Sequence, residues 1–185
     1  KCTLEYAIYG VFAFCPDCGA HNSLQILNKN LELVHKILAF AATLPDQEMG
    51  QRLIENALEN TVSAFDGFGR ATCAAFCGKA TDLEKAKAIS FQNIIGAQTN
   101  VRTLFGHDIA SAVKESQWKT VNRGFQKRHL IAHKMGVIDD DYVKKANDPT
   151  AIIGRRVVIL PDEIAELTQL LTTIGKQFYE TVSKL

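Results

Sequence analysis

The sequence lacks several signals that mark large classes of protein. No apolar run approaches the roughly 18 residues that a membrane-spanning helix needs, and the start of the chain has no signal-peptide pattern. There is also no glycine-rich loop of the P-loop kind, and no serine or cysteine lies in a recognisable triad or elbow context. These absences predict a cytoplasmic protein without membrane contacts, and they disfavour P-loop and conventional serine or cysteine nucleophile chemistry.

The chain also has little net charge and no internal repeat or low-complexity linker. Its formal net charge is +1, so a contact with nucleic acid has to come from local clustering of basic residues. What it does have is a hydrophobic content of 46% over 185 residues, enough to bury a proper core. These features predict one compact domain and not a disordered chain.

The five cysteines point to a reduced compartment, because their number is odd and only one Cys-x-x-Cys pair is present. That pair, Cys15 and Cys18, is followed by a glycine, which is typical of a zinc knuckle. Cys2 is a further candidate ligand, and His21 could complete the set. A Cys-x-x-Cys pair without metal is the alternative. Cys73 and Cys77, one helical turn apart in an alanine-rich stretch, are expected to be structural thiols.

Residues 1–22 are predicted to form a partial zinc-ribbon-like segment with structural zinc, and residues 23–185 a helical domain. Strand-like residues alternate around Gly10 in the pattern of a β-hairpin; they are Leu4, Tyr6, Ile8, Val11 and Ala13. Because the numbering begins with Lys1 and not with methionine, we expect the chain to start inside a longer or processed protein. A partner for Cys2 in a second knuckle would then precede Lys1.

Helical spacing of apolar residues predicts an all-α fold, a helical bundle, for the rest of the chain. Asp139-Asp140-Asp141 reads as an exposed turn, and residues 156–160 as a short strand or extended segment. The first expected helices cover residues 24–41 and a long stretch that starts near Asp46. A short helix capped by Thr81 follows, with a break near Gly96. The remaining helices are expected over residues 100–105, 108–113, 116–134, where Gly136 is the stop, and 164–182.

The most informative residues lie near the end of the helix predicted over 116–134. Arg128, His129 and His133 stand there in a basic strip in which Glu115 is the single acid between residues 114 and 134. The residues of this strip that we expect to contact nucleic acid are Lys119, Arg123, Lys127 and Lys134. A solvated helix face is the plainer explanation of the same charges.

Helix geometry places His129 and His133 on one face, because they are four residues apart, and rotates Arg128 by about 100° from His129. A two-fold dimer that packs these helices together could bring Arg128 and His133 of both subunits into one cleft. A histidine with a pKa of about 6.5 could there accept the proton of a ribose 2′-hydroxyl, while arginine stabilises negative charge at phosphorus.

The stretch Arg128-His129-Leu130-Ile131-Ala132-His133 resembles the motif of the HEPN superfamily, in which an arginine, a polar residue, a short spacer and a histidine follow one another late in an all-helical domain. The resemblance covers roughly residues 24–185. It implies a metal-independent endoribonuclease of the toxin, antiviral, stress or RNA-processing kind. It also implies a homodimer, a 2′,3′-cyclic phosphate product and, for a toxin, an antitoxin protein as partner.

Carried over residue by residue, Arg128 matches the motif arginine, His129 the polar position and His133 the motif histidine. An acid on the second helix often supports the arginine in this superfamily, and either Glu59 or Asp66 could do so here. Two other readings stay open. In one, the domain is a non-catalytic dimerisation or nucleic-acid-binding module; in the other, a zinc segment reads nucleic acid and the bundle only dimerises.

Overall fold

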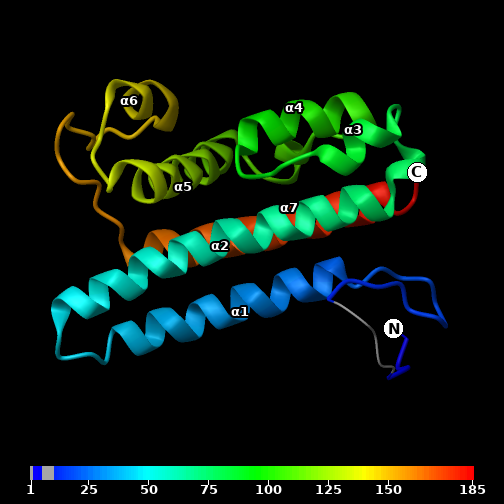
Figure 1. Ribbon diagram of the computed structural model, residues 1–185, viewed down its shortest axis with the longest axis horizontal. Helices are drawn as coiled ribbons and strands as arrows, with labels where there is room; N and C mark the ends of the chain where they lie inside the picture. Colours follow the sequence, from blue (N-terminus) through cyan, green and yellow to red (C-terminus); the bar gives the residue numbers. More distant parts are fainter. Residues whose placement is uncertain (1, 6–10) are drawn as a thin grey trace.

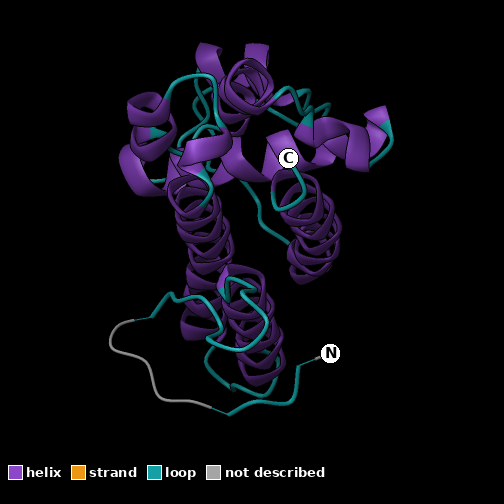
Figure 2. Cartoon of the chain, turned by 90° about the vertical axis from the view of Figure 1, so that its right-hand side faces the viewer, coloured by secondary structure: helices purple, strands orange, loops and turns teal. Residues whose placement is uncertain are grey.

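The computed structural model describes residues 2–5 and 11–185, and in these residues it is a bundle of α-helices without extended strands. Helices α1, α2 and α7 run side by side, and α3 to α6 lie on the opposite side of α2 and α7 from α1 (Figures 1 and 2). The helices are α1 (Ser23–Ala41), α2 (Gln47–Ala75), α3 (Leu83–Ala88), α4 (Ile94–Phe105), α5 (Glu115–Lys134), α6 (Asp140–Ala146) and α7 (Pro161–Val182). The all-α prediction is confirmed.

The predicted N-terminal β-hairpin falls largely on residues 6–10, which lie outside the described residues. In the described part of the N-terminal segment, β pairing consists of one isolated bridge between Phe14 and His21. Where this segment ends and α1 begins, the hydroxyls of Ser23 and of Thr72 on α2 form a buried hydrogen bond of 2.9 Å.

The α1–α2 hairpin follows directly from the sequence. On α1 the apolar residues of the predicted stripe are buried at positions 27, 31, 34, 38 and 41. The Asp46 carboxylate caps α2 by accepting hydrogen bonds from the backbone N–H groups of Glu48 and Met49, at 2.9 and 3.1 Å. The predicted helix start near Asp46 is therefore confirmed.

The expected break near Gly96 is wrong. The Asn93 side chain accepts a hydrogen bond from the Gly96 N–H at 3.1 Å and so caps a helix that begins at Ile94. Gly96 consequently lies in the first turn of α4, and the chain breaks earlier, between α3 and Asn93. The same helix ends at Gly106, whose φ of +66° is the left-handed conformation that favours glycine.

Two further helix starts differ from prediction. The cap of α3 is Asp82, which accepts from the Lys85 N–H at 3.1 Å, and not Thr81, whose N–H bonds to the carbonyl of Leu104. The acidic run expected as a turn is instead a helix start, because the Asp139 carboxylate caps α6 by accepting from the Tyr142 N–H at 2.9 Å. A second and third acid in the first turn of α6 are favourable there, since the helix dipole is positive at that end.

Aromatic rings fill the centre of the bundle where α2, α5 and α7 meet. The ring centroids of Phe65 and Phe125 are 6.3 Å apart, and those of Phe68 and Phe178 are 6.2 Å apart, in edge-to-face contact. Phe91, from the segment between α3 and α4, enters the same cluster against Phe65 at 5.9 Å. This packing fixes α5, and with it the motif residues, against α2.

The end of α5 is set by two residues with positive φ. Met135 has a φ of +50° and Gly136 a φ of +78°, and the Gly136 N–H bonds to the carbonyl of Leu130. The carbonyl of Gly136 in turn accepts from the N–H of Val157, so the predicted extended segment 156–160 lies beside this turn. The predicted stop at Gly136 is confirmed.

Candidate functional site

His129 and His133 lie side by side at the exposed surface of α5. Their ring centroids are 4.9 Å apart with an angle of 53° between the planes, as the four-residue spacing predicts. Desolvation lowers the pKa of His129, and the positive charges of His133 and Lys134 lower it further. His129 therefore stays neutral, and able to accept a proton, over a wider pH range than a free histidine.

Arg128 leaves the helix in a different direction and is half-buried. Its Nη1 is 3.5 Å from the side-chain oxygen of Gln92, which lies in the segment ahead of α4. Its Nε is buried and has no hydrogen-bond partner among the described residues. Its Nη groups make one side-chain hydrogen bond among these residues, to Gln92 in an exposed position, and so keep donor capacity for another group, such as a phosphate oxygen.

Asp66, one of the two acids expected to support Arg128, has another role. It is buried, and its Oδ1 accepts hydrogen bonds from the Phe91 N–H at 2.6 Å and from the Ser90 hydroxyl at 3.3 Å. Among the described residues no ion pair joins Arg128 to either Asp66 or Glu59. The structure therefore does not bring these acids into the motif.

The acid of α2 that does pair across the fold is Glu55. Its side chain is 5% exposed and accepts from Arg156 at 2.7 Å and from Arg52 at 3.2 Å. The signal for its burial is present in the sequence, because Glu55 is spaced three and seven residues ahead of the core residues Leu58 and Val62. The partner Arg156 is 101 positions away and carries no such signal.

The basic strip of α5 is largely engaged with protein atoms. Lys127, expected to contact RNA, is buried, with its ammonium bonded to Glu163 and to the carbonyl of Val158 at 2.8 Å each. It is therefore not part of an exposed basic surface. The other three expected residues also have partners: Lys119 pairs with Glu115, Lys134 with Asp139, and Arg123 donates to the carbonyl of Asn147.

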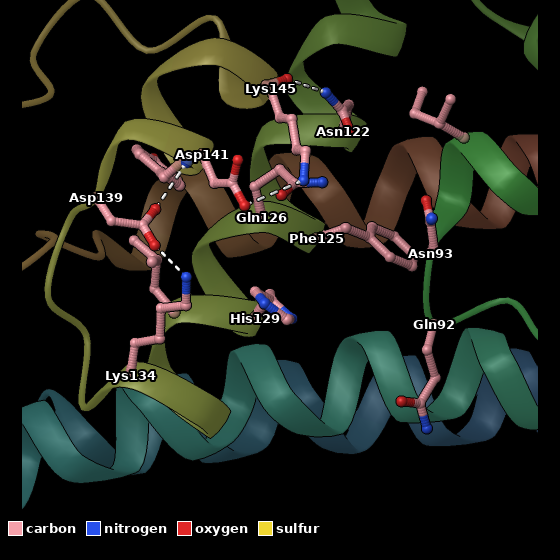
Figure 3. Close-up of a pocket in the computed structure, with 13 residues that line it drawn as sticks. Gln92, Asn93, Asn122, Phe125, Gln126, His129, Lys134, Asp139, Asp141 and Lys145 are labelled. Carbon is pink, nitrogen blue, oxygen red and sulfur yellow. Dashed lines mark hydrogen bonds and ion pairs between the residues drawn. The ribbon is translucent and has the colours of Figure 1, made fainter.

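A pocket of about 560 Å³ opens beside His129 (Figure 3). It lies between α5, α6 and the segment leading into α4. Its wall carries four side-chain amides that sequence reasoning did not single out, namely Gln92, Asn93, Asn122 and Gln126. No local pattern marks them, since they come from two separate stretches of chain that only the fold joins.

Three cysteines converge at the N-terminal segment. The sulfur atoms of Cys2, Cys15 and Cys18 all lie within 4.8 Å of one another, and those of Cys2 and Cys15 are 3.8 Å apart. The turn is closed by Gly19, which has a φ of +67° and donates its N–H to the carbonyl of Cys15 at 2.9 Å. Backbone N–H groups of Cys18 and Asp17 lower the pKa of Cys15, as suits a thiolate ligand.

His21 is not part of this thiol group. Its ring packs against Phe14, with centroids 4.8 Å apart, and its Nδ1 accepts from the Ser23 N–H at 3.4 Å. The Tyr179 hydroxyl bonds to both the N–H and the carbonyl of His21, at 2.9 Å each. Burial lowers the pKa of the imidazole. These contacts make His21 an anchor of the segment on α7.

The two remaining cysteines behave differently from the N-terminal three. Cys73 is buried in the core, as predicted for a structural thiol, and burial raises its pKa to about 12. Cys77 is half-buried one turn further along. Neither joins the thiol group.

No family model, curated protein or solved structure matches the chain. None of the helices in the described residues is long and apolar enough to cross a membrane.

Proposed function

We propose that the protein is a metal-independent endoribonuclease of the HEPN kind, with Arg128, His129 and His133 in its active site. The observation that carries this proposal is the pair of exposed imidazoles on α5, 4.9 Å apart, next to an arginine whose Nη groups make one hydrogen bond among the described residues. Two imidazoles within reach of one phosphodiester can act as proton acceptor and proton donor, and a guanidinium binds phosphate oxygens. RNA is the fitting substrate because it supplies the 2′-hydroxyl.

The reaction needs no group beyond these side chains and the RNA. A neutral imidazole takes the proton of the 2′-hydroxyl, and O2′ attacks the adjacent phosphorus. The bond from phosphorus to the 5′-oxygen breaks, and a protonated imidazole gives its proton to that leaving oxygen. The products are a 2′,3′-cyclic phosphate and a 5′-hydroxyl. The lowered pKa of His129 suits it to the accepting role, and Arg128 stabilises the charge that develops at phosphorus.

A homodimer would complete this site. Arg128 extends towards Gln92, whereas the two imidazoles are exposed on the neighbouring face of α5. Packing α5 of two copies across a two-fold axis would place Arg128 of one copy near the histidines of the other. RNA then lies in the cleft between the copies. An antitoxin protein that covers this cleft would regulate it.

A non-catalytic, dimerising or nucleic-acid-binding domain is the second candidate. The observation in its favour is the engagement of the basic strip, in which Lys127, Lys134 and Arg123 already have partners within the chain. Such contacts are what a purely structural role of these charges would require.

Incubation of the purified protein with mixed-sequence RNA in the presence of EDTA separates the two candidates. We expect cleavage that leaves cyclic phosphate ends, and a loss of at least about 100-fold in rate for Arg128→Ala and for His133→Ala. His35→Gln is the matched control, because His35 lies on α1 and bonds to Thr168, away from the motif. Folded dimer that leaves RNA intact, or variants that cut like the parent protein, would favour the non-catalytic domain.

We also propose that the thiol group of Cys2, Cys15 and Cys18 holds structural zinc. Zinc–sulfur bonds of about 2.3 Å in a tetrahedron separate the sulfur atoms by about 3.8 Å, which is the distance between Cys2 and Cys15. The three thiolates fill three of four positions, so another donor supplies the fourth. The metal would stabilise the segment and take no part in RNA cleavage.

Metal analysis of the purified protein tests the zinc site. We expect one zinc per chain, and thiolate-to-metal absorption bands when cobalt replaces it. Cys18→Ser should lose the metal, whereas Cys77→Ser should keep it, since Cys77 lies outside the thiol group. Protein that is pure, reduced and free of metal even after zinc is added would contradict this proposal. RNA cleavage by Cys18→Ser shows in addition whether the two proposals are independent.

A further inference from the structure

We propose that the pocket beside His129 binds one nucleobase of the RNA and so selects the position of cleavage. The choice of a nucleobase as ligand rests on the proposed ribonuclease function. The volume, about 560 Å³, lies in the range of sites for small molecules and is ample for a single base. His129 itself lines the pocket, and in Figure 3 its ring stands at the side where α5 faces the segment ahead of α4.

The charge of the pocket fits a neutral ligand better than a phosphate. Each of its two lysines is matched by a carboxylate on its wall, Lys134 by Asp139 and Lys145 by Asp141, the latter pair 3.6 Å apart. The lowered pKa of His129 adds an imidazole that is neutral at neutral pH. A site built for phosphate would instead present cations without counter-ions.

The polar groups that remain are amides, which can both donate and accept hydrogen bonds. Base edges present both kinds of group, and protein amides pair with them in that way. Asn122 gives its Nδ2 to the carbonyl of Lys145 at 2.6 Å, but its Oδ1 is buried and has no partner among the described residues. Gln126 lies one turn further along α5. Its side chain makes no hydrogen bond to any of the residues that the structure describes, so it is free to contact a ligand.

Apolar side chains offer surface to the faces of a base. Ile95, which lines the pocket and is 42% exposed, supplies most of this surface, while Phe125 and Leu130 line the pocket with at most 2% of each residue exposed. A flat aromatic ligand gains from such surface when one of its faces is buried against it. Apolar floor and amide wall together match a heterocycle with polar edges.

The pocket is also placed correctly relative to the proposed catalytic groups. Gln92, in the segment ahead of α4, receives the hydrogen bond from Arg128 at 3.5 Å, and His129, on α5, has its ring centroid 4.9 Å from that of His133. A base held between these two side chains brings its ribose next to the imidazoles. The geometry thus couples base binding to the choice of the phosphodiester that is cut.

Binding of ribonucleosides to the purified protein tests the inference without any cleavage. Adenosine, guanosine, cytidine and uridine are titrated by calorimetry and by NMR of the histidine rings, with ribose 5-phosphate and inorganic phosphate as probes that lack a base. We expect at least one nucleoside to bind and to shift the His129 signals, with both base-free probes binding at least 10-fold more weakly. Gln126→Trp, which fills the pocket, should weaken that binding at least 10-fold. Gln169→Ala, an exposed amide change on α7, should not.

The two proposals fail in different ways. If RNA is cut but no nucleoside binds, or if Gln126→Trp binds nucleosides and cuts every sequence as the parent protein does, the base pocket is overturned while the ribonuclease stands. If a nucleoside binds as described but RNA stays intact, the pocket is supported and the ribonuclease is not. Binding of ribose 5-phosphate as tight as that of the nucleosides overturns the base as the recognised group.

Discussion

Lys127 is joined to Glu163 by two contacts of 2.8 Å, one to each carboxylate oxygen, and this pair ties the middle of α5 to the start of α7. Only 8% of the Lys127 side chain is exposed, and its ammonium also bonds to the carbonyl of Val158. The same carboxylate accepts from the N–H of Leu160 at 3.1 Å, which caps α7. One carboxylate thus holds a helix start, a buried cation and the extended segment together.

Replacing Glu163 by glutamine should lower the free energy of unfolding by about 2 kcal/mol, because the buried Lys127 ammonium loses its counter-ion. The matched control is Glu115→Gln, which breaks the exposed pair with Lys119 and should change stability by less than about 1 kcal/mol. Urea unfolding followed by circular dichroism measures both. Equal effects of the two changes would show that the Lys127 pair is no more important than a surface contact.

Two glycines of α2, Gly67 and Gly69, should respond to alanine in opposite ways. A Cβ on Gly69 would come within 2.4 Å of the ring of Phe91, whereas a Cβ on Gly67 meets nothing within 4 Å. Gly69→Ala should therefore cost about 1–3 kcal/mol by overpacking. Gly67→Ala should stabilise by up to about 1 kcal/mol through helix propensity. Thermal unfolding midpoints that move in the same direction would disprove the close contact at Phe91.

The Asp66 carboxylate holds the segment ahead of α4 by accepting a hydrogen bond from Phe91, so alanine and asparagine at position 66 should differ in their effect on stability. Asp66→Ala leaves the buried N–H of Phe91 without its acceptor and should cost about 1–3 kcal/mol. Asp66→Asn keeps an oxygen in place and should cost less than half of that. Hydrogen exchange of the Phe91 amide reports the bond directly. If both variants cleave RNA as the parent protein does once folded, Asp66 is not the acid that supports Arg128.

The elements of the fold could largely be predicted because their signals are local. Apolar spacing defines α1, α2, α5 and α7, and a capping carboxylate at Asp46 or a glycine at Gly136 marks their ends. Where two local signals compete, the prediction fails. Gly96 is typical of a helix break, but Asn93 caps the helix that contains it. Such competition is settled by a hydrogen bond that the pattern of residue types does not reveal.

The site was only partly predictable because its contacts are not local. The close approach of the His129 and His133 rings follows from their spacing, but the burial of Lys127 depends on Glu163, which is 36 positions away. The pocket likewise requires α4 and α6 to meet α5, and the acidic run at the start of α6 predicts a turn instead of a helix. Helix periodicity does not tell which basic residues remain exposed, since that depends on the neighbouring elements.

Three histidines resist protonation in the folded chain. Burial lowers the pKa of His21, of His107 and of His129. At His107 the negative charge of Asp108 raises the pKa again in part. His107 stacks on Phe178 with ring centroids 6.2 Å apart and planes 10° from parallel. Its Nε2 is buried and lacks a partner among the described residues. Protonation there would place a charge against the core.

The protein should therefore lose stability as the pH falls from about 7 to 5. An unfolded histidine takes up a proton near a pKa of about 6.5, while the folded His107 does so only at lower pH, so the unfolded state binds more protons in this window. His107→Phe should flatten the loss by removing one such group. Urea unfolding at pH 7, 6 and 5 measures the slope, and an unaltered slope in His107→Phe would show that the buried imidazole is not its source.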